Sequence, residues 1–216
     1  MNRLAEAQTQ NNSKSAPTIC RGFFIRIVIM KILLNKIEKI ISEKKNPIIA
    51  IDGPCASGKT TLANMLSERF CFQIIHTDSF FLPPEMRSKE RLSQPGGNVH
   101  YERFNDEVAY GIEIGSEFIY GIYNCHTGTQ TNSLPVSPLR PIVIEGSYSL
   151  HPEIQVAYDL KIFVEADYET RLQRILERSG TESLEIFKNR WIPLENSYFK
   201  KYDIKNKCDI KVKTDR

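Results

Sequence analysis

A short glycine-rich stretch constrains this chain more than any other part of it. The run IIAID, residues 48–52, is apolar up to its last residue and leads into GPCASGKT, from Gly53 to Thr60. This second segment matches G-x-x-x-x-G-K-[ST], the pattern of a loop that binds phosphate between a strand and a helix. Glycines let the backbone curl so that its N–H groups point at phosphate oxygens, and a helix beginning near Gly58 adds its positive end. We therefore predict a buried strand, a phosphate loop and a helix in succession.

The motif also predicts a role for each polar position. Lys59 is expected to reach the β- and γ-phosphates, and the Thr60 hydroxyl is expected to bind Mg²⁺. The predicted cofactors are therefore ATP or GTP, together with Mg²⁺. Cys55 and Ala56 are small enough to fill the loop. The predicted nucleotide-binding positions in this segment are Gly53, Ala56, Ser57, Gly58, Lys59, Thr60 and Thr61.

Composition limits the classes of partner. The chain has 216 residues, enough for one domain with a sizeable core, and its formal net charge of +3 is too weak to predict nucleic acid or a membrane as the main partner. The five cysteines include no C-x-x-C pair. A disulfide framework or a zinc site is therefore not expected, and we predict a cytoplasmic protein that acts on a small molecule.

The N-terminal region is expected to lie outside the folded domain. Residues 1–18 are polar, which predicts disorder, and the more apolar stretch that follows is interrupted by Arg21 and Arg26. That stretch is too short and too charged to cross a bilayer. MKILLNKIEKIISEKKN, beginning at Met30, has helical spacing. We therefore predict a disordered extension over 1–29 and one folded P-loop domain over 30–216.

Strand-like and helix-like segments alternate along the rest of the chain. The strand candidates, besides IIAID, are QIIHT, EFIYGIYN, PIVIEG, LKIFVEA and CDIKVK. Helical spacing is seen over 58–70, in YERFNDEVAYGI, over 167–178 with Asp167 as an N-cap, and over 181–201 with a break near Pro193. This alternation predicts an α/β fold with a mainly parallel sheet that is covered on both faces.

Two acidic residues follow strand candidates that should end at the same edge of that sheet as the phosphate loop. Asp78 follows QIIHT, and Glu145 ends PIVIE. Asp78 would face the γ-phosphate as a base for an acceptor hydroxyl, or it is simply a turn or N-cap residue. Glu145 would act on Mg²⁺ through water, or it is a buried carboxylate bonded to loop backbone.

Three arginines share one face of a predicted helix. Arg171, Arg174 and Arg178 are spaced i, i+3, i+7. Cations arranged in this way suit a lid that holds the phosphates during transfer, although a solvated helix surface is the simpler alternative.

The phosphate loop alone does not exclude other nucleotide-binding proteins. Asn206 to Asp209 fits the guanine-reading string N-K-x-D, but no D-x-x-G accompanies it. A motor would need a longer chain. A nucleotide-dependent regulator without chemistry stays open, but the acids and arginines together favour a kinase of a small molecule.

Several segments, in their order and spacing, resemble the uridine kinase branch of the P-loop nucleoside kinases. They are IAIDGPCASGKTTLA, HTDSFF, QPGGNVHYERF, VIEGSYSLHP, and RLQRILER with RWIPLEN, and together they span about residues 46–213. The resemblance implies a three-layer P-loop NTPase fold with a parallel five-stranded sheet, flanking helices and a helical lid at about 171–195. Members of this family are often homo-oligomers.

The resemblance also implies roles by position. Asp78 resembles the base that takes the proton of the ribose 5′-hydroxyl, while Thr60 and Glu145 resemble the Mg²⁺ environment. Arg171 resembles a substrate contact, and Arg174 and Arg178 resemble lid contacts to phosphates. Tyr123 falls where the family places an aromatic ring against the base, although it could be a plain sheet residue.

The chain departs from the family on the acceptor side. Many members carry an aspartate near the position of His100, where it holds the ribose hydroxyls, and His100 can offer hydrogen bonds but no carboxylate. The residues after Tyr123 do not reproduce the family's Tyr-Asp-Phe region. Uridine is the leading acceptor on this reading, with another nucleoside, pantothenate or a sugar phosphate as alternatives.

Overall fold

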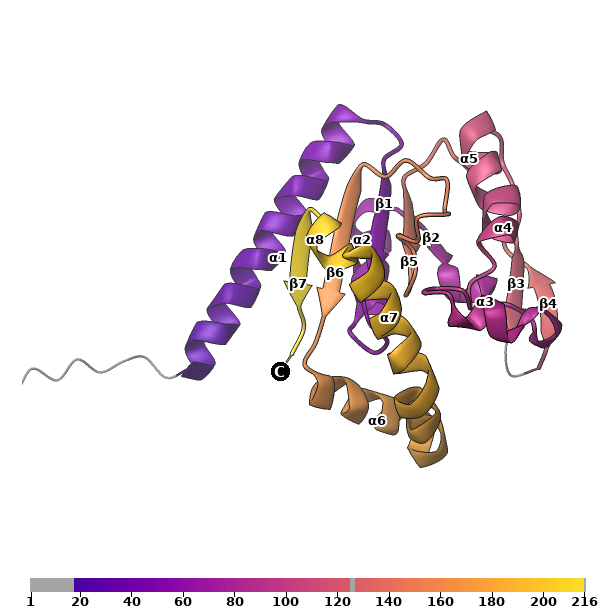
Figure 1. Ribbon diagram of the computed structural model, residues 1–216. Helices are drawn as coiled ribbons and strands as arrows, with labels where there is room; N and C mark the ends of the chain where they lie inside the picture. Colours follow the sequence, from indigo (N-terminus) through magenta and orange to yellow (C-terminus); the bar gives the residue numbers. More distant parts are fainter. Residues whose placement is uncertain (1–17, 125–126, 216) are drawn as a thin grey trace, which may run out of the picture.

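The computed structural model describes residues 18–124 and 127–215, with side chains from residue 28 onward (Figure 1). The predicted disorder of residues 1–17 therefore lies outside the described residues, as do Cys125 and His126. The longer helices are α1 (Thr18–Glu43), α2 (Lys59–Phe70), α6 (Tyr168–Ile186) and α7 (Ile192–Tyr202). The shorter helical segments are η1 (Thr77–Phe80), η2 (Pro84–Met86), α3 (Lys89–Ser93), α4 (Tyr101–Phe104), η3 (Asn105–Ala109), α5 (Tyr110–Ile114), η4 (Phe187–Trp191) and α8 (Ile204–Lys207).

A parallel five-stranded sheet forms the centre of the fold, which confirms the predicted α/β class. Its strand order is β2-β5-β1-β6-β7, and all neighbouring pairs run parallel. Because β1 is the middle strand and the phosphate loop follows it directly, the loop lies at the centre of the edge where the strands end. The strands are β1 (Ile48–Asp52), β2 (Gln73–His76), β5 (Ile142–Glu145), β6 (Leu160–Glu165) and β7 (Ile210–Lys213).

Alternate residues of the strands feed two separate cores. On β5, Ile142 and Ile144 belong to one apolar cluster, whereas Val143 belongs to the other. The cluster that contains Val143 is completed by α1 and α2, and the opposite one by α4, η3, α7 and α8. This period of two along the strands produces a three-layer arrangement with helices on both faces.

Glycine is required at the turn that opens the phosphate loop. Gly53 has φ +146°, and a Cβ built there would lie 2.0 Å from the carbonyl oxygen of Val164 on β6. A side chain cannot fit without moving the neighbouring strand. Gly58, with φ +98°, ends the loop immediately before the first residue of α2.

A small antiparallel hairpin stands apart from the main sheet. It consists of β3 (Gly121–Asn124) and β4 (Thr129–Asn132). The sequence predicted strand material up to Asn124 but read the next residues only as a polar stretch. β4 has no apolar side chain, so hydrophobic alternation could not reveal it.

The segment predicted as a lid is a helical arm with two irregular points. Gly180 lies inside α6 with φ +79° and ψ +178°, and the π-helical η4 joins α6 to α7, where Pro193 occupies the first turn. The predicted break near Pro193 thus begins slightly earlier. Asp167 is the N-cap residue of α6 as predicted, but its carboxylate makes no capping hydrogen bond and pairs with Lys213 at 2.9 Å.

Helix α1 begins at Thr18 and not at Met30 as expected from the sequence. Ile29 and Met30 pack against the same core as Leu33 and Ile37. In Figure 1 this helix runs beside β7 at the edge of the sheet. Among the described helices, none is both long and apolar enough to cross a membrane. The domain boundary at residue 30 stays a prediction.

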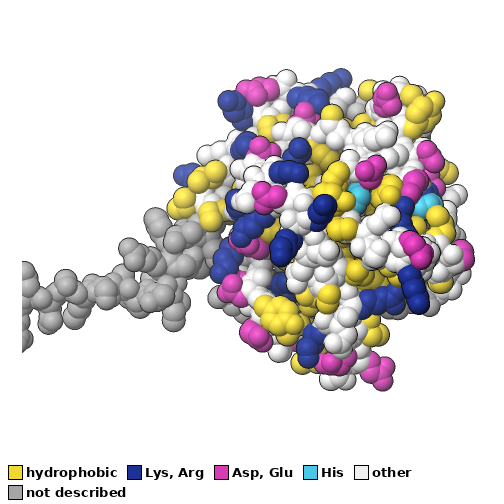
Figure 2. Space-filling model, in the orientation of Figure 1, with side chains coloured by type: hydrophobic (Ala, Val, Ile, Leu, Met, Phe, Trp, Pro, Cys, Tyr) yellow, Lys and Arg dark blue, Asp and Glu magenta, His cyan; other side chains and the backbone are white. Residues whose placement is uncertain are grey.

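The surface visible in Figure 2 carries basic and acidic side chains interspersed with one another. This mixture agrees with the small net charge of +3. That face therefore presents no broad basic field of the kind that follows a nucleic-acid backbone.

One buried carboxylate joins the elements around the loop. Asp52, at the end of β1, is fully buried and accepts hydrogen bonds from the N–H groups of Gly53 (2.6 Å), Tyr148 (3.2 Å) and Leu150 (3.0 Å). It also accepts one from the Tyr198 hydroxyl at 2.8 Å. Burial raises the pKa of Asp52 to about 6. The hydrogen bonds from Leu150, Tyr198 and Gly53 and the charge of Lys59 lower the pKa, but by less than burial raises it.

This raised pKa predicts how the free energy of unfolding depends on pH. Between the ordinary value of 3.8 and about 6 the folded state binds the Asp52 proton more tightly than the unfolded state, so stability falls as pH rises through that window. The loss attributable to Asp52 should be about 3 kcal/mol.

The measurement is urea unfolding from pH 4 to 7 of the natural chain and of Asp52→Asn, which does not titrate. The stability difference between the two should shift in favour of Asp52→Asn as pH rises. The exposed Asp106→Asn serves as the matched control and should follow the natural chain. A difference that is constant over this range would contradict the assignment.

Candidate nucleotide and acceptor site

The phosphate loop presents its polar groups to one cavity. Lys59 is 8% exposed, and its Nζ donates to the Pro54 carbonyl at 3.0 Å and lies 3.3 Å from Ser147 Oγ. The buried Ser57 hydroxyl has no hydrogen-bond partner among the described protein atoms. Because the first N–H groups of α2 also lack acceptors within the helix, the loop offers a positive cradle that fits a polyphosphate.

The predicted metal environment comes together around Glu145. The Thr60 hydroxyl donates to Glu145 Oε1 at 3.0 Å, and His76 Nδ1 lies 2.6 Å from the same oxygen. This hydrogen bond is the main cause of the raised pKa of His76. Among the described residues, no group of three or more His, Cys, Asp or Glu could hold a metal alone. One hydroxyl and one carboxylate fit Mg²⁺ of the kinase type, where phosphates and waters complete the coordination.

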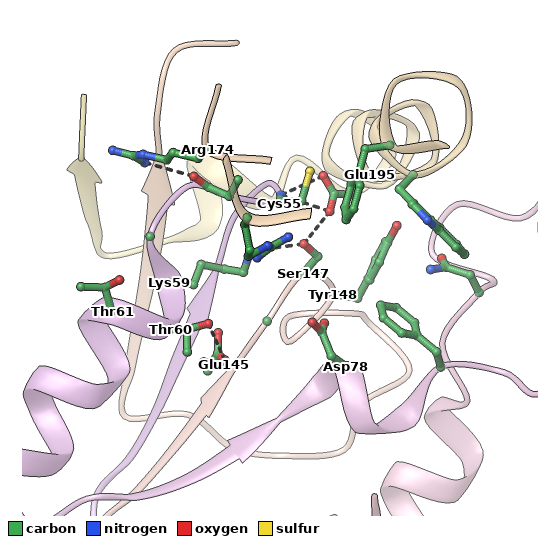
Figure 3. Close-up of a pocket in the computed structure, with 18 residues that line it drawn as sticks. Cys55, Lys59, Thr60, Thr61, Asp78, Glu145, Ser147, Tyr148, Arg174 and Glu195 are labelled. Atoms are coloured by element: carbon green, nitrogen blue, oxygen red, sulfur yellow. Dashed lines mark hydrogen bonds between the residues drawn. The ribbon is translucent and has the colours of Figure 1, made fainter. Parts of the chain in front are cut away.

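Asp78 faces the same cavity from the segment after β2. In Figure 3 its carboxylate and the Lys59 ammonium project from different elements toward a common space. The side chain is open to this cavity yet enclosed by protein, and the loss of bulk water raises the pKa of its carboxyl. The negative charges of Glu145 and Glu195 act in the same direction, whereas Lys59 and His76 oppose the shift.

Arg171 lies beneath the phosphate loop and does not line the cavity that contains Asp78 and Lys59. It is buried, and its guanidinium donates to the Cys55 carbonyl at 2.8 Å and lies 3.5 Å from the Glu195 carboxylate. Glu195, on α7, accepts in turn from the Cys55 N–H at 2.9 Å and from the Ser147 hydroxyl at 2.8 Å. This arrangement ties both α6 and α7 to the loop. Arg171 thus contacts the loop and Glu195, and its predicted contact with a substrate stays a prediction.

Arg174 and Arg178 do line the cavity. Arg174 donates to the Ala56 carbonyl at 3.0 Å and to the Thr214 carbonyl at 2.6 Å, whereas Arg178 is exposed beside the ring of Phe187. The exposure of the three arginines therefore increases along the predicted helix face. Arg171 is buried, Arg174 is partly buried, and Arg178 is exposed and can reach into the cavity.

Two cavities meet at Phe81. The first, of about 300 Å³, holds the loop, Asp78, Glu145 and the lid arginines. The second, of about 500 Å³, is lined by His100, Arg103 and Tyr123 together with the Pro83–Pro84 turn. The two residues predicted on the acceptor side, His100 and Tyr123, thus share one cavity next to the loop. Burial lowers the pKa of His100, which favours its neutral form.

Sequence reasoning missed several residues of this site. They are Glu195, Ser147, Tyr148, Asn98 and Trp191. One feature of the sequence could have indicated Glu195. In the segment IPLENSYF this acidic residue falls on the buried face of α7, where an apolar residue would be expected. Asn98 and Trp191 lie in segments quoted above for their resemblance, but neither stands in a chemical motif of its own.

Comparison with known proteins finds relatives in sequence and solved structures of similar fold. No protein-family model matches the chain. The uridine kinase of Clostridium botulinum strain Okra is 26% identical over 155 residues, which cover 64% of this chain and 71% of that one. The solved structure described as a possible uridine kinase from Bacillus stearothermophilus superposes with a TM-score of 0.59 at 19% identity, covering 83% of this chain and 98% of the other.

A third relative has an unrelated name. The tRNA-specific adenosine deaminase subunit tad2 of Schizosaccharomyces pombe is 35% identical over 152 residues, which cover 67% of this chain but only 36% of that protein. This chain thus spans about a third of it. Zinc deaminases require a C-x-x-C pair, and this sequence contains none. The similarity therefore carries no deaminase chemistry to this chain.

The fold and the loop define a P-loop protein of the kinase type: a five-stranded parallel sheet, a phosphate loop after its middle strand and a helical arm over that loop. The chain is also similar in sequence to uridine kinases, at 26% identity over 64% of its length, and this similarity supports a uridine kinase-like P-loop kinase family.

The buried pair between Arg171 and Glu195 generates a prediction. Arg171→Met should lower the free energy of unfolding by about 3–5 kcal/mol, because the Glu195 carboxylate would stay buried without its charge partner. Adding Glu195→Gln should recover much of the loss, since the amide oxygen can still accept from Cys55 and Ser147. Urea unfolding of the single and double variants measures both effects.

The matched control lies on the same helix. Gln173 is exposed two residues away, and Gln173→Met should leave the unfolding midpoint nearly unchanged. An Arg171→Met protein as stable as this control would show that the ion pair does not hold the arm to the loop.

Proposed function

We propose that this protein is a kinase that transfers the γ-phosphoryl group of ATP to a hydroxyl of a small molecule, with the 5′-hydroxyl of uridine or a related nucleoside as the preferred acceptor. One observation carries the proposal. A single cavity holds a phosphate loop with its lysine, a hydroxyl–carboxylate pair suited to Mg²⁺, and a separate carboxylate of raised pKa.

Each group has a part in the proposed reaction. ATP with Mg²⁺ supplies the phosphoryl group and neutralises much of its charge. Asp78 orients the acceptor hydroxyl and takes its proton as the new oxygen–phosphorus bond forms and ADP leaves. Lys59, the loop amides, Arg174 and Arg178 stabilise the negative charge on the moving group, while Thr60 and Glu145 hold the metal.

Two further observations support a nucleoside acceptor. The relatives named as uridine kinases match nearly two thirds of this chain. The second cavity provides Tyr123 and a neutral His100 close to the loop, and these groups could contact a base and a sugar. We propose that His100 and Tyr123 bind the acceptor there, although His100 offers no carboxylate to sugar hydroxyls.

The main alternative is a kinase that acts on another small hydroxyl compound. The second alternative is a regulator that binds nucleotide without transferring phosphate. A panel of nucleosides and small alcohols, scored by ADP release and by product mass, separates these cases. A regulator would change shape with nucleotide and yield no phosphorylated product in any reaction.

Asp78→Asn tests the base directly. The amide has the same shape but cannot accept the hydroxyl proton, so kcat should fall by roughly two to four orders of magnitude while ATP binding persists. Steady-state kinetics and calorimetry with ATP analogue and Mg²⁺ measure the two quantities. A variant with normal turnover would remove Asp78 from the mechanism.

Lys59→Ala provides the contrasting variant. Its loss should weaken phosphate handling, so both the affinity for ATP and kcat should fall, unlike the pattern expected for Asp78→Asn. Kinetics identical to those of the natural chain would count against the assigned role of the phosphate loop.

The raised pKa of Asp78 predicts the pH profile. The base must be ionised to act, so kcat should fall as pH drops through the pKa of Asp78, at a higher pH than an ordinary aspartate would give. The groups that face it, Lys59, Glu145, Glu195 and His76, shape this limb together. A rate that is flat down to pH 4 would contradict the assignment.

A further inference from the structure

Two buried polar side chains in the first cavity have no hydrogen-bond partner in the protein. Asn98 is 5% exposed, and neither its amide nitrogen nor its amide oxygen makes a hydrogen bond; the hydroxyl of Tyr148, 1% exposed, likewise makes none. Both residues line the cavity that contains Asp78 and the loop. Buried polar atoms without partners are costly, so such atoms in a cavity point to a ligand that completes them.

These two residues are held firmly. The Asn98 carbonyl accepts from the Leu82 N–H at 2.9 Å, and Arg91 donates to the carbonyls of both its neighbours, Gly97 and Val99, at 2.9 and 2.8 Å. A Cβ on Gly97 would lie 1.9 Å from the Arg91 carbonyl, so the turn before Asn98 admits only glycine. The position of the Asn98 amide is therefore fixed by the backbone around it.

Tyr148 is fixed by strain and packing. Its φ of +78° is unfavourable for a side chain of this size, and its ring packs on Tyr198 with centroids 4.8 Å apart. Its N–H is bonded to Asp52. Strained backbone of this kind is retained where the surrounding structure enforces it, and it clusters at ligand sites. The Asn98 amide lies close enough to influence the Tyr148 hydroxyl, but the two groups do not reach hydrogen-bond geometry.

The charges of the cavity indicate what kind of ligand fits. Its cations, Lys59, Arg174 and Arg178, all belong to the loop or the helical arm. The same cavity is also lined by Asn98, Tyr148 and the stacked rings of Phe81 and Trp191, whose centroids are 6.1 Å apart. Lys59 offsets the charge of Asp78, and the side chains of Asn98 and Tyr148 offer uncharged hydrogen-bond donors and acceptors to a ligand.

We infer that Asn98 and Tyr148 determine acceptor specificity by hydrogen-bonding an uncharged polar group, such as a second hydroxyl, next to the hydroxyl that is phosphorylated. The amide can accept from one hydroxyl and donate to another, and the Tyr148 hydroxyl can do either. An acceptor that lacks this second group leaves these atoms unpaired and is disfavoured. The inference rests on the proposed kinase function and narrows its acceptors to compounds with an uncharged polar group next to the phosphorylated hydroxyl.

The test compares two acceptors that differ only in the hydroxyls other than the one to be phosphorylated. Uridine and 2′,3′-dideoxyuridine share the 5′-hydroxyl, and the second compound lacks both the 2′- and the 3′-hydroxyl. The natural chain should favour uridine by about tenfold or more in kcat/KM over the dideoxy compound. Asn98→Ala and Tyr148→Phe should each remove most of that preference by lowering the rate with uridine, with KM for ATP unchanged.

Matched controls distinguish this role from a structural one. Tyr158→Phe removes a hydroxyl that donates to the Ser149 carbonyl at 2.8 Å, and Asn105→Ala removes an amide bonded to Glu153 and Gln155. Both controls should lower the unfolding midpoint and leave the preference for uridine intact. Tyr148→Phe should do the reverse, because its hydroxyl has no protein partner to lose.

Three results would overturn the inference. Equal rates with uridine and dideoxyuridine, or an unchanged preference in both variants, would remove it while leaving the kinase function standing. If the natural chain bound ATP but phosphorylated no acceptor in the panel, the proposed function would fail and the inference would fail with it.

Discussion

The site depends on how one buried carboxylate is solvated. Asp52 is fully buried, and hydrogen bonds from backbone groups of the phosphate loop and of the loop after β5, together with the Tyr198 hydroxyl on α7, replace its hydration. Three segments distant in the sequence are thereby fixed to the end of the middle strand. Because the phosphate loop and the loop after β5 both donate to this carboxylate, the cradle and the strained Tyr148 are positioned from the end of β1.

The donor side of the site is built from a sequence motif and from strand register, whereas the acceptor side is built from turns and a hairpin. Gly53 and Lys59 follow from a motif whose geometry leaves little choice, while Glu145 is set by strand register opposite Ile51. The acceptor cavities instead draw on turns and on the β3–β4 hairpin, where polar residues can change without loss of core packing.

The same division sets what the sequence could predict. The parallel sheet, the loop and the placement of Asp78 and Glu145 could be read because apolar runs and a glycine motif report local structure directly. Glu195, Asn98 and Tyr148 could not, since their importance comes from contacts between residues far apart along the chain. Arg171 shows the limit clearly: the spacing placed it on the correct helix face, but only the packing shows that it serves the loop.

The position of Cys55 has a chemical consequence for the loop. Its thiol lies under Arg171 and Glu195, where burial raises its pKa to about 12. A thiol reacts with oxidants and alkylating agents through its ionised form, which is nearly absent here at neutral pH. A cysteine at the heart of the phosphate cradle is thus kept inert by the arm that covers it, and oxidative damage would reach it only while that cover is lifted.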